Sequence, residues 1–203
     1  EVYHTNLLVK MLCLLTNKAA SFDPSGVGLE MEGDKPNWYD SLNGLPGLLG
    51  SSLSETLELK RLCQFVLERL DGLRIENEKL PVFVELADFI KELSAVFDSE
   101  KDSQAMWHKV NDAKEHYRQH IRRGINGKEV DLSVREIHDF LKKIVERCRQ
   151  ASEKAATPQG ALSTYFYHDV IDYAPLDKFY QDQPYVLPVA FKRHNLPLFL
   201  EGF

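Results

Sequence analysis

Apolar residues recur at helical spacing along most of the chain. A period of three to four residues predicts amphipathic helices, because such positions share one helical face. The clearest stripe, from Leu57 to Leu70, follows the capping-box sequence Ser52-Leu53-Ser54-Glu55, which starts helices. Ser133 precedes another stripe and belongs to the residue types that favour the N-cap. The pattern predicts helices over residues 2–20, 52–70, 80–97, 102–123 and 132–155.

Two segments depart from this helical pattern. Residues 22–51 contain six glycines and three prolines, which exclude a long regular element. Loops of this length are uncommon unless they are functional. Residues 163–173 alternate in polarity, which predicts an extended segment or a short strand. We therefore expect a mainly α fold, an antiparallel helical array with one long ordered loop.

Both ends of the chain are apolar. Residue 1 is Glu, the apolar run Leu7–Leu15 begins soon after it, and residues 196–203 form a second apolar run. An exposed apolar run of this kind needs a cover. We expect residues 1–203 to be a single helical segment of a larger catalytic domain, covered by the remainder of the same polypeptide or by a second copy. The first run is too short to span a bilayer, so no membrane partner is predicted.

Charge and cysteine usage narrow the function classes. The net charge is −6 and the basic residues are scattered, so no nucleic-acid footprint is present. Cys13, Cys63 and Cys148 lie singly in apolar patterns, which indicates free thiols in a reducing compartment and predicts a cytoplasmic location. His116 and His120 have the spacing of a zinc pair, but no third ligand is evident nearby, and no metal is predicted.

The long loop carries the residues that suggest chemistry. Four carboxylates, a Trp and a Tyr lie within eleven positions, from 30 to 40. The apolar face of a sugar packs on aromatic rings, and glycosidic cleavage requires a carboxylic acid that protonates the leaving oxygen. Burial beside an indole raises the pKa of such an acid. The alternative is a core-anchoring Trp with solvated loop acids. The residues concerned are Glu30, Glu32, Asp34, Trp38, Tyr39 and Asp40.

Within this loop, Asn37-Trp38-Tyr39-Asp40-Ser41-Leu42-Asn43 resembles the Asp-Trp-Asn-Asp-Gly-Met-Asn motif of the cellobiose and chitobiose phosphorylase family. The glycine-rich turn that follows, and the helix Ser-Glu-Thr-Leu-Glu-Leu-Lys-Arg after it, are also similar to that family. The resemblance covers about residues 26–62, with weaker similarity in 163–167 and 196–202. Asn37 and Tyr39 replace two motif residues, so the chain would be a divergent member.

The resemblance implies a part of an (α/α)6 barrel that acts as a glycoside phosphorylase or inverting glycoside hydrolase on β-linked oligosaccharides. It implies Asp40 as the general acid and Trp38 as a wall of the sugar subsite, with no cofactor but with inorganic phosphate as a co-substrate. Tyr165 and His168 could contribute to a substrate or phosphate site, or could instead cap a strand. The expected substrate-binding residues are Trp38, Tyr39, Asn43, Glu30, Glu32, Asp34, Tyr165 and His168.

A non-catalytic interpretation stays open beside the enzymatic one. The five predicted helices fall short of the twelve that a complete barrel of this class needs. The chain could therefore be a helical interaction module whose aromatic, acidic loop binds a glycan or a partner protein without turnover. Activity on β-linked disaccharides, with and without phosphate, distinguishes these two hypotheses.

Overall fold

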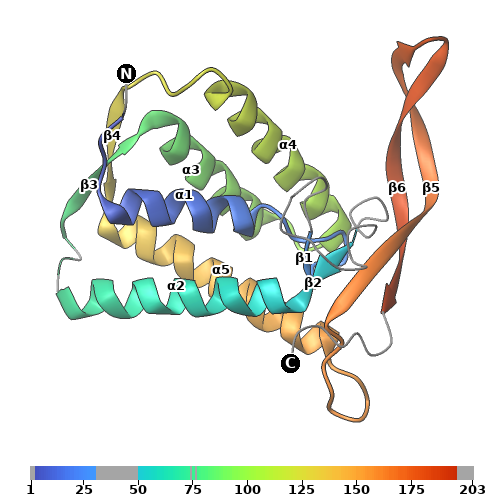
Figure 1. Cartoon of the computed structure of the whole chain (residues 1–203), viewed down its shortest axis with the longest axis horizontal. Coiled ribbons are helices and arrows are strands. Elements are labelled where there is room, and N and C mark those ends of the chain that lie inside the picture. The colour runs from blue at the N-terminus through green and yellow to red at the C-terminus, as the bar shows by residue number, and fades with distance from the viewer. Residues whose placement is uncertain (1–2, 31–49, 74, 76, 196–203) are drawn as a thin grey trace, which may run out of the picture.

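The computed structural model describes residues 3–30, 50–73, 75 and 77–195, and these form five helices and six strands. The class is α+β, with 53% helix, 27% strand and two antiparallel sheets (Figure 1). The expected mainly α helical array is therefore wrong, and the part of an (α/α)6 barrel expected with it is wrong for the same reason. Strand pairing between distant segments, which helical periodicity does not report, accounts for the difference.

Five helices occur where the apolar periodicity predicts them. Ser133 begins the last helix with a complete capping box, in which its hydroxyl accepts the backbone N–H of Glu136 at 3.2 Å. The helices are α1 (Leu7–Ala19), α2 (Leu53–Leu73), α3 (Val84–Ser99), α4 (Ser103–Ile121) and α5 (Val134–Ala155).

The helices surround one hydrophobic core. Helix α2 runs along α5, and α3 runs along α4 (Figure 1). Phe140 of α5 is buried and stacks on Phe97 of α3, with ring centroids 6.3 Å apart. Phe89 stacks on Tyr117 in the same way, at 4.5 Å. Each large buried side chain of this kind stabilises the fold by about 1.5–3 kcal/mol, which makes this core the main source of stability.

A small sheet closes one end of the helical body. It pairs β3 (Lys79–Phe83) with β4 (Glu129–Ser133), and each strand leads directly into a helix. The helix predicted over 80–97 therefore begins four residues too early, and the one predicted over 132–155 begins two residues too early. Leu80 and Phe83 have the spacing of a helix, whereas in β3 it is Leu80 and Val82 that share one face. Pro81 is tolerated because a two-stranded sheet has only edge strands.

The second sheet lies at the other end of the helices. Its order is β1 (Leu29–Glu30), β2 (Ser51–Ser52), β5 (Tyr165–Tyr180) and β6 (Gln183–Asn195). Strands β1 and β2 pair antiparallel, with Glu30 opposite Ser51, and thus hold the two ends of the 31–49 segment together.

Strands β5 and β6 form a long ribbon that extends away from the helices (Figure 1). The extended segment expected over 163–173 is thus much longer, and it has a strand partner. The partner strand was missed because Pro184 and Pro188 interrupt its sequence pattern.

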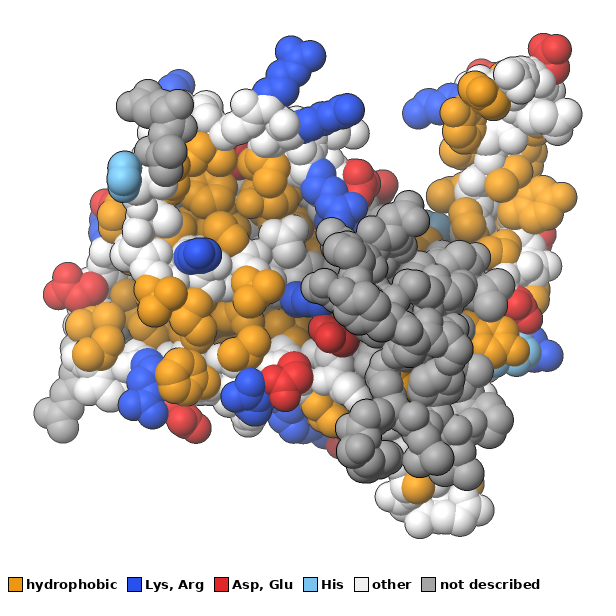
Figure 2. All heavy atoms as spheres, in the orientation of Figure 1, with side chains coloured by type: hydrophobic (Ala, Val, Ile, Leu, Met, Phe, Trp, Pro, Cys, Tyr) orange, Lys and Arg blue, Asp and Glu red, His pale blue; other side chains and the backbone are white. Residues whose placement is uncertain are grey.

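Several apolar side chains remain exposed on the described surface (Figure 2). On α1, Leu7 is 72% and Leu14 is 51% exposed. The expected apolar end at 196–203 lies outside the described residues. Among the described helices, none combines the length and apolar character needed to cross a membrane.

Candidate functional site

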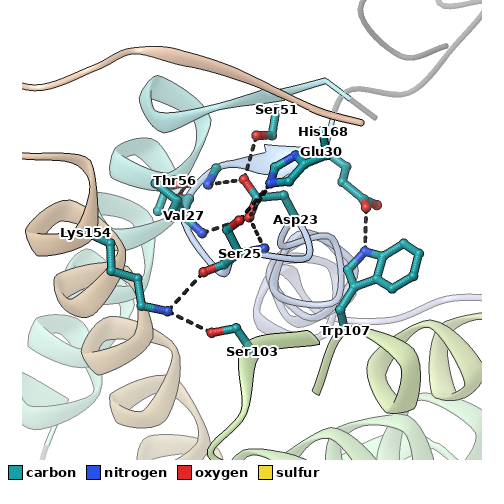
Figure 3. Close-up of polar contacts among 11 residues, drawn as sticks. Asp23, Ser25, Val27, Glu30, Ser51, Thr56, Ser103, Trp107, Lys154 and His168 are labelled. Carbon is teal, nitrogen blue, oxygen red and sulfur yellow. Dashed lines mark hydrogen bonds and ion pairs between the residues drawn. The ribbon is translucent and has the colours of Figure 1, made fainter. Parts of the chain in front are cut away.

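A buried aspartate organises the turn that leads into β1. The carboxylate of Asp23, 1% exposed, accepts the backbone N–H groups of Ser25 and Val27 at 3.0 Å and that of Gly28 at 2.8 Å (Figure 3). It also accepts the hydroxyl of Ser51 at 2.6 Å. A side chain at Gly28 would lie 2.5 Å from that hydroxyl oxygen, so the close approach of β2 requires glycine. The turn is therefore fixed onto the sheet.

His168 of β5 joins the same cluster from the far end of the sequence. Its side chain is fully buried, and its Nε2 lies 2.8 Å from Ser25 Oγ and 4.0 Å from Asp23 Oδ1. A Ser-His-Asp catalytic triad places the serine and the aspartate on different ring nitrogens. Here both face Nε2, so the geometry is that of a buried polar cluster that attaches β5 to the turn.

Glu30 and Trp107 form a second arrangement beside this turn, at the start of the 31–49 segment. The indole N–H of Trp107 on α4 donates to Glu30 Oε1 at 2.6 Å (Figure 3). The indole also meets the ring of Phe191 on β6 edge to face, with centroids 5.2 Å apart. The carboxylate and Phe191 together fix the orientation of a partly exposed aromatic surface.

The Glu30 carboxyl occupies an environment that favours its protonated form. Burial raises its pKa above the ordinary 4.5, and the negative charge of Asp23 adds to the shift. The ammonium of Lys114, 3.8 Å from Oε2, and the indole hydrogen bond act in the opposite direction. The result is a partly desolvated acid beside an aromatic ring, the chemistry that the loop sequence suggests for Asp40.

The structure brings two of the expected substrate-binding residues into one neighbourhood. Glu30 and His168 both lie near Asp23 (Figure 3). Tyr165 is buried and pairs with Ser52. It points to the opposite face of β5 from His168, because strand side chains alternate and the two residues are three positions apart. The general acid and the remaining binding residues lie outside the described residues: Asp40, Glu32, Asp34, Trp38, Tyr39 and Asn43.

Sequence reasoning missed Trp107 and Asp23 as members of a site. Trp107 falls within the helix predicted over 102–123, and its distance of 77 positions from Glu30 hides the contact. One signal was available for Asp23: Asp23-Pro24-Ser25-Gly26 is a typical turn sequence in which the aspartate accepts backbone N–H groups.

No group of three metal-ligating side chains is present among the described residues. The His116 and His120 rings do lie together, with centroids 4.4 Å apart, on exposed turns of α4. A cavity of about 320 Å³ lies at the far end of α5, lined in part by Asp71 and His138. This cavity lies at the first turns of α5, whereas Glu30 lies on β1 at the opposite end of the helices (Figure 1), so the two are remote from each other.

Comparisons with known proteins add no assignment. No family model matches this chain, and no curated protein is similar to it at a significant level. The functional argument therefore depends on the residues themselves.

Proposed function

We propose that this chain carries part of a carbohydrate-active site that cleaves β-linked oligosaccharides, as a glycoside phosphorylase or an inverting glycoside hydrolase. The observation that carries the proposal is the Glu30–Trp107 pair, which lies directly before the 31–49 segment, because an oriented indole beside a protonatable carboxyl suits a sugar ring. The indole offers an apolar face, and the carboxyl offers a hydrogen-bond partner for a hydroxyl.

Glu30 and Ser51 are paired, and they flank the segment that contains Asp40 and Trp38. In the proposed reaction Asp40 donates its proton to the glycosidic oxygen, and Trp38 and Tyr39 shape the sugar subsite. Phosphate, or a water activated by a second carboxylate, attacks the opposite face of the sugar. Glu30 acts as a positioning residue for Trp107.

The direct test is turnover of β-linked disaccharides by the full-length protein, with and without phosphate. Sugar 1-phosphate formed only with phosphate indicates phosphorolysis, and free sugar alone indicates hydrolysis. Asp40→Asn is expected to lower kcat by about 10²–10⁴-fold, the usual contribution of a positioned acid. Trp107→Phe keeps an aromatic ring but loses the N–H donor, and should raise KM more than it lowers kcat.

Asp112→Asn provides the matched control, because Asp112 is an exposed carboxylate on α4. It should leave both constants unchanged. Full turnover by the Asp40→Asn variant, or no cleavage of any β-linked disaccharide by the wild type, would contradict the catalytic proposal.

A second candidate is a non-catalytic interaction module, which the β5–β6 ribbon favours. Ten large apolar side chains of this ribbon are 37–63% exposed, which is unusual for a surface without a partner. If the wild type binds β-linked oligosaccharides or a protein without turnover, this interpretation replaces the first. The ten are Val170, Ile171, Tyr173, Leu176, Phe179, Tyr180, Tyr185, Val186, Leu187 and Val189.

A further inference from the structure

A polar pocket of about 200 Å³ lies between α5 and the start of α4. Helix α5 lines it with Lys143, Arg147, Gln150 and Lys154, which share one helical face because they are spaced three or four residues apart. Gly26 of the Asp23 turn lines the other side. The volume is below the 300–1,000 Å³ of typical drug-sized sites, which favours a small ligand.

Arg147 is a largely buried cation without a carboxylate partner in the described part of the chain. Its guanidinium lies between two aromatic rings, 4.8 Å from the centroid of Phe22 and 4.7 Å from that of Phe97. Its Nη1 contacts the sulfur of Met106, a weak acceptor, and its buried Nε has no hydrogen-bond partner. Burial lowers the pKa of Arg147 to about 10, which reflects the cost of holding this charge away from water.

Lys154 brings a second positive charge to the same pocket. Its ammonium donates to the Ser25 carbonyl at 3.0 Å and to Ser103 Oγ at 2.8 Å, both neutral acceptors (Figure 3). Partial burial lowers the pKa of Lys154 and repulsion from Arg147 lowers it further, whereas the charges of Asp23 and Asp102 act in the opposite direction. The net lowering means that these two like charges are only partly compensated, and an anion between them reduces that cost.

The carboxylates that border the pocket are already engaged. Glu100 pairs with Lys109 at 2.9 Å and accepts two backbone N–H groups. Glu146 accepts both a guanidinium nitrogen of Arg149 and the Gln150 amide. Asp98 pairs with Lys143 at 2.6 Å. These pairings leave Arg147, Lys154 and the exposed Lys101, which also lines the pocket, as the charges that remain for a ligand.

We propose that this pocket binds a small oxyanion, such as phosphate or sulfate, through Arg147 and Lys154. Guanidinium and ammonium groups both donate charge-assisted hydrogen bonds to such oxygens. The bound anion would connect α5, α4 and the Asp23 turn, which are otherwise joined here mainly by the Lys154 hydrogen bonds. The site lies on the other side of the turn from the Glu30–Trp107 pair (Figure 3), and the proposal does not depend on the proposed function.

Titration of the purified full chain with sodium phosphate tests the proposal, with calorimetry for the Kd and thermal unfolding for the Tm. Sodium chloride at matched ionic strength is the reference, and sulfate should compete with phosphate. Saturable binding that raises the Tm beyond the chloride reference is expected. Arg147→Gln and Lys154→Gln should each weaken the Kd about tenfold or more, the worth of a hydrogen bond to a charged group.

Arg61→Gln is the matched control, because Arg61 of α2 is an exposed arginine that pairs with Glu58 and does not line the pocket. It should bind phosphate like the wild type. Lys154→Gln keeps the experiment decisive if Arg147→Gln fails to fold, since Lys154 lies at an exposed position. Binding no stronger than chloride, or an unchanged Kd in Lys154→Gln, would overturn the proposal.

Discussion

At the scale of single residues, Asp23 and Glu30 show how one buried carboxylate can serve structure and another can serve chemistry. Asp23 is surrounded by four donors within hydrogen-bond distance. Glu30 has one strong donor, the Trp107 indole, and a more distant ammonium. The first environment satisfies a negative charge, whereas the second leaves it partly uncompensated.

Asp23→Ala is expected to destabilise the chain by about 3–5 kcal/mol, because it leaves buried N–H groups without an acceptor, each costing about 1–3 kcal/mol. Urea denaturation followed by circular dichroism measures the change. The exposed Asp112→Ala variant should stay within about 0.5 kcal/mol of the wild type. A loss below 1 kcal/mol for Asp23→Ala would mean that the turn does not depend on this carboxylate.

The raised pKa of Glu30 predicts a specific dependence of stability on pH. Since the folded protein holds this proton more tightly than the unfolded chain, the stabilising contribution is complete below pH 4.5 and is lost as the pH rises through the folded pKa. Stability of the wild type should therefore fall relative to Glu30→Gln over the range above pH 4.5. Parallel pH profiles of the two proteins in urea denaturation would contradict the assignment.

At the scale of elements, the β5–β6 ribbon depends on a tight turn. Gln181 and Asp182 have φ values of 47° and 62°, and the loop between the strands consists of these two residues. This is the geometry of a type I′ turn, which favours Asn-Gly and which most other residues adopt at a cost. The ribbon is therefore held in place by pairing rather than by its turn residues.

Replacing Gln181 by Asn together with Asp182 by Gly should stabilise the ribbon by about 1 kcal/mol, because both residues accept a positive φ. Hydrogen exchange should show roughly fivefold slower exchange of the β5 and β6 amides. The α5 amides are the internal control and should keep their rates. Faster exchange in the ribbon would show that Gln181 and Asp182 stabilise this turn more than Asn-Gly does.

At the scale of the whole molecule, the β5–β6 ribbon has few strand pairings with the rest of the described chain. Beyond the short pairing of β5 with β2, it is two-stranded, and isolated hairpins are marginally stable in water. Its ten exposed apolar side chains lie on both faces of the ribbon, because neighbouring strand residues alternate, and together they leave roughly 800 Å² or more of apolar surface exposed. A second copy fits this surface, because two ribbons related by a two-fold axis can pack one apolar face against the other.

We therefore expect a concentration-dependent dimer, measurable by sedimentation velocity. Ile171→Lys and Phe179→Lys place a charge on the ribbon and should shift the chain to monomer. Leu162→Lys, which changes an exposed apolar residue outside the ribbon, should leave the association unchanged. A wild type that stays monomeric at every concentration would assign the ribbon to another partner.

The sequence by itself determined the positions of the five helices and the capping role of Ser133. Helical hydrogen bonds join residues four apart, so their signal is complete within a short window. The same local pattern predicts an ordered, non-helical loop over 22–51, of which residues 31–49 lie outside the described residues.

Only the tertiary structure decided the fold class and the neighbours of each polar group. Strand β6 lies opposite β5, and β3 lies opposite β4, because of pairings that no local period reports. The same is true of the polar contacts, since Ser25 meets His168 across 143 positions and Glu30 meets Trp107 across 77. Such contacts depend on how the elements pack, and packing is a property of the whole folded chain.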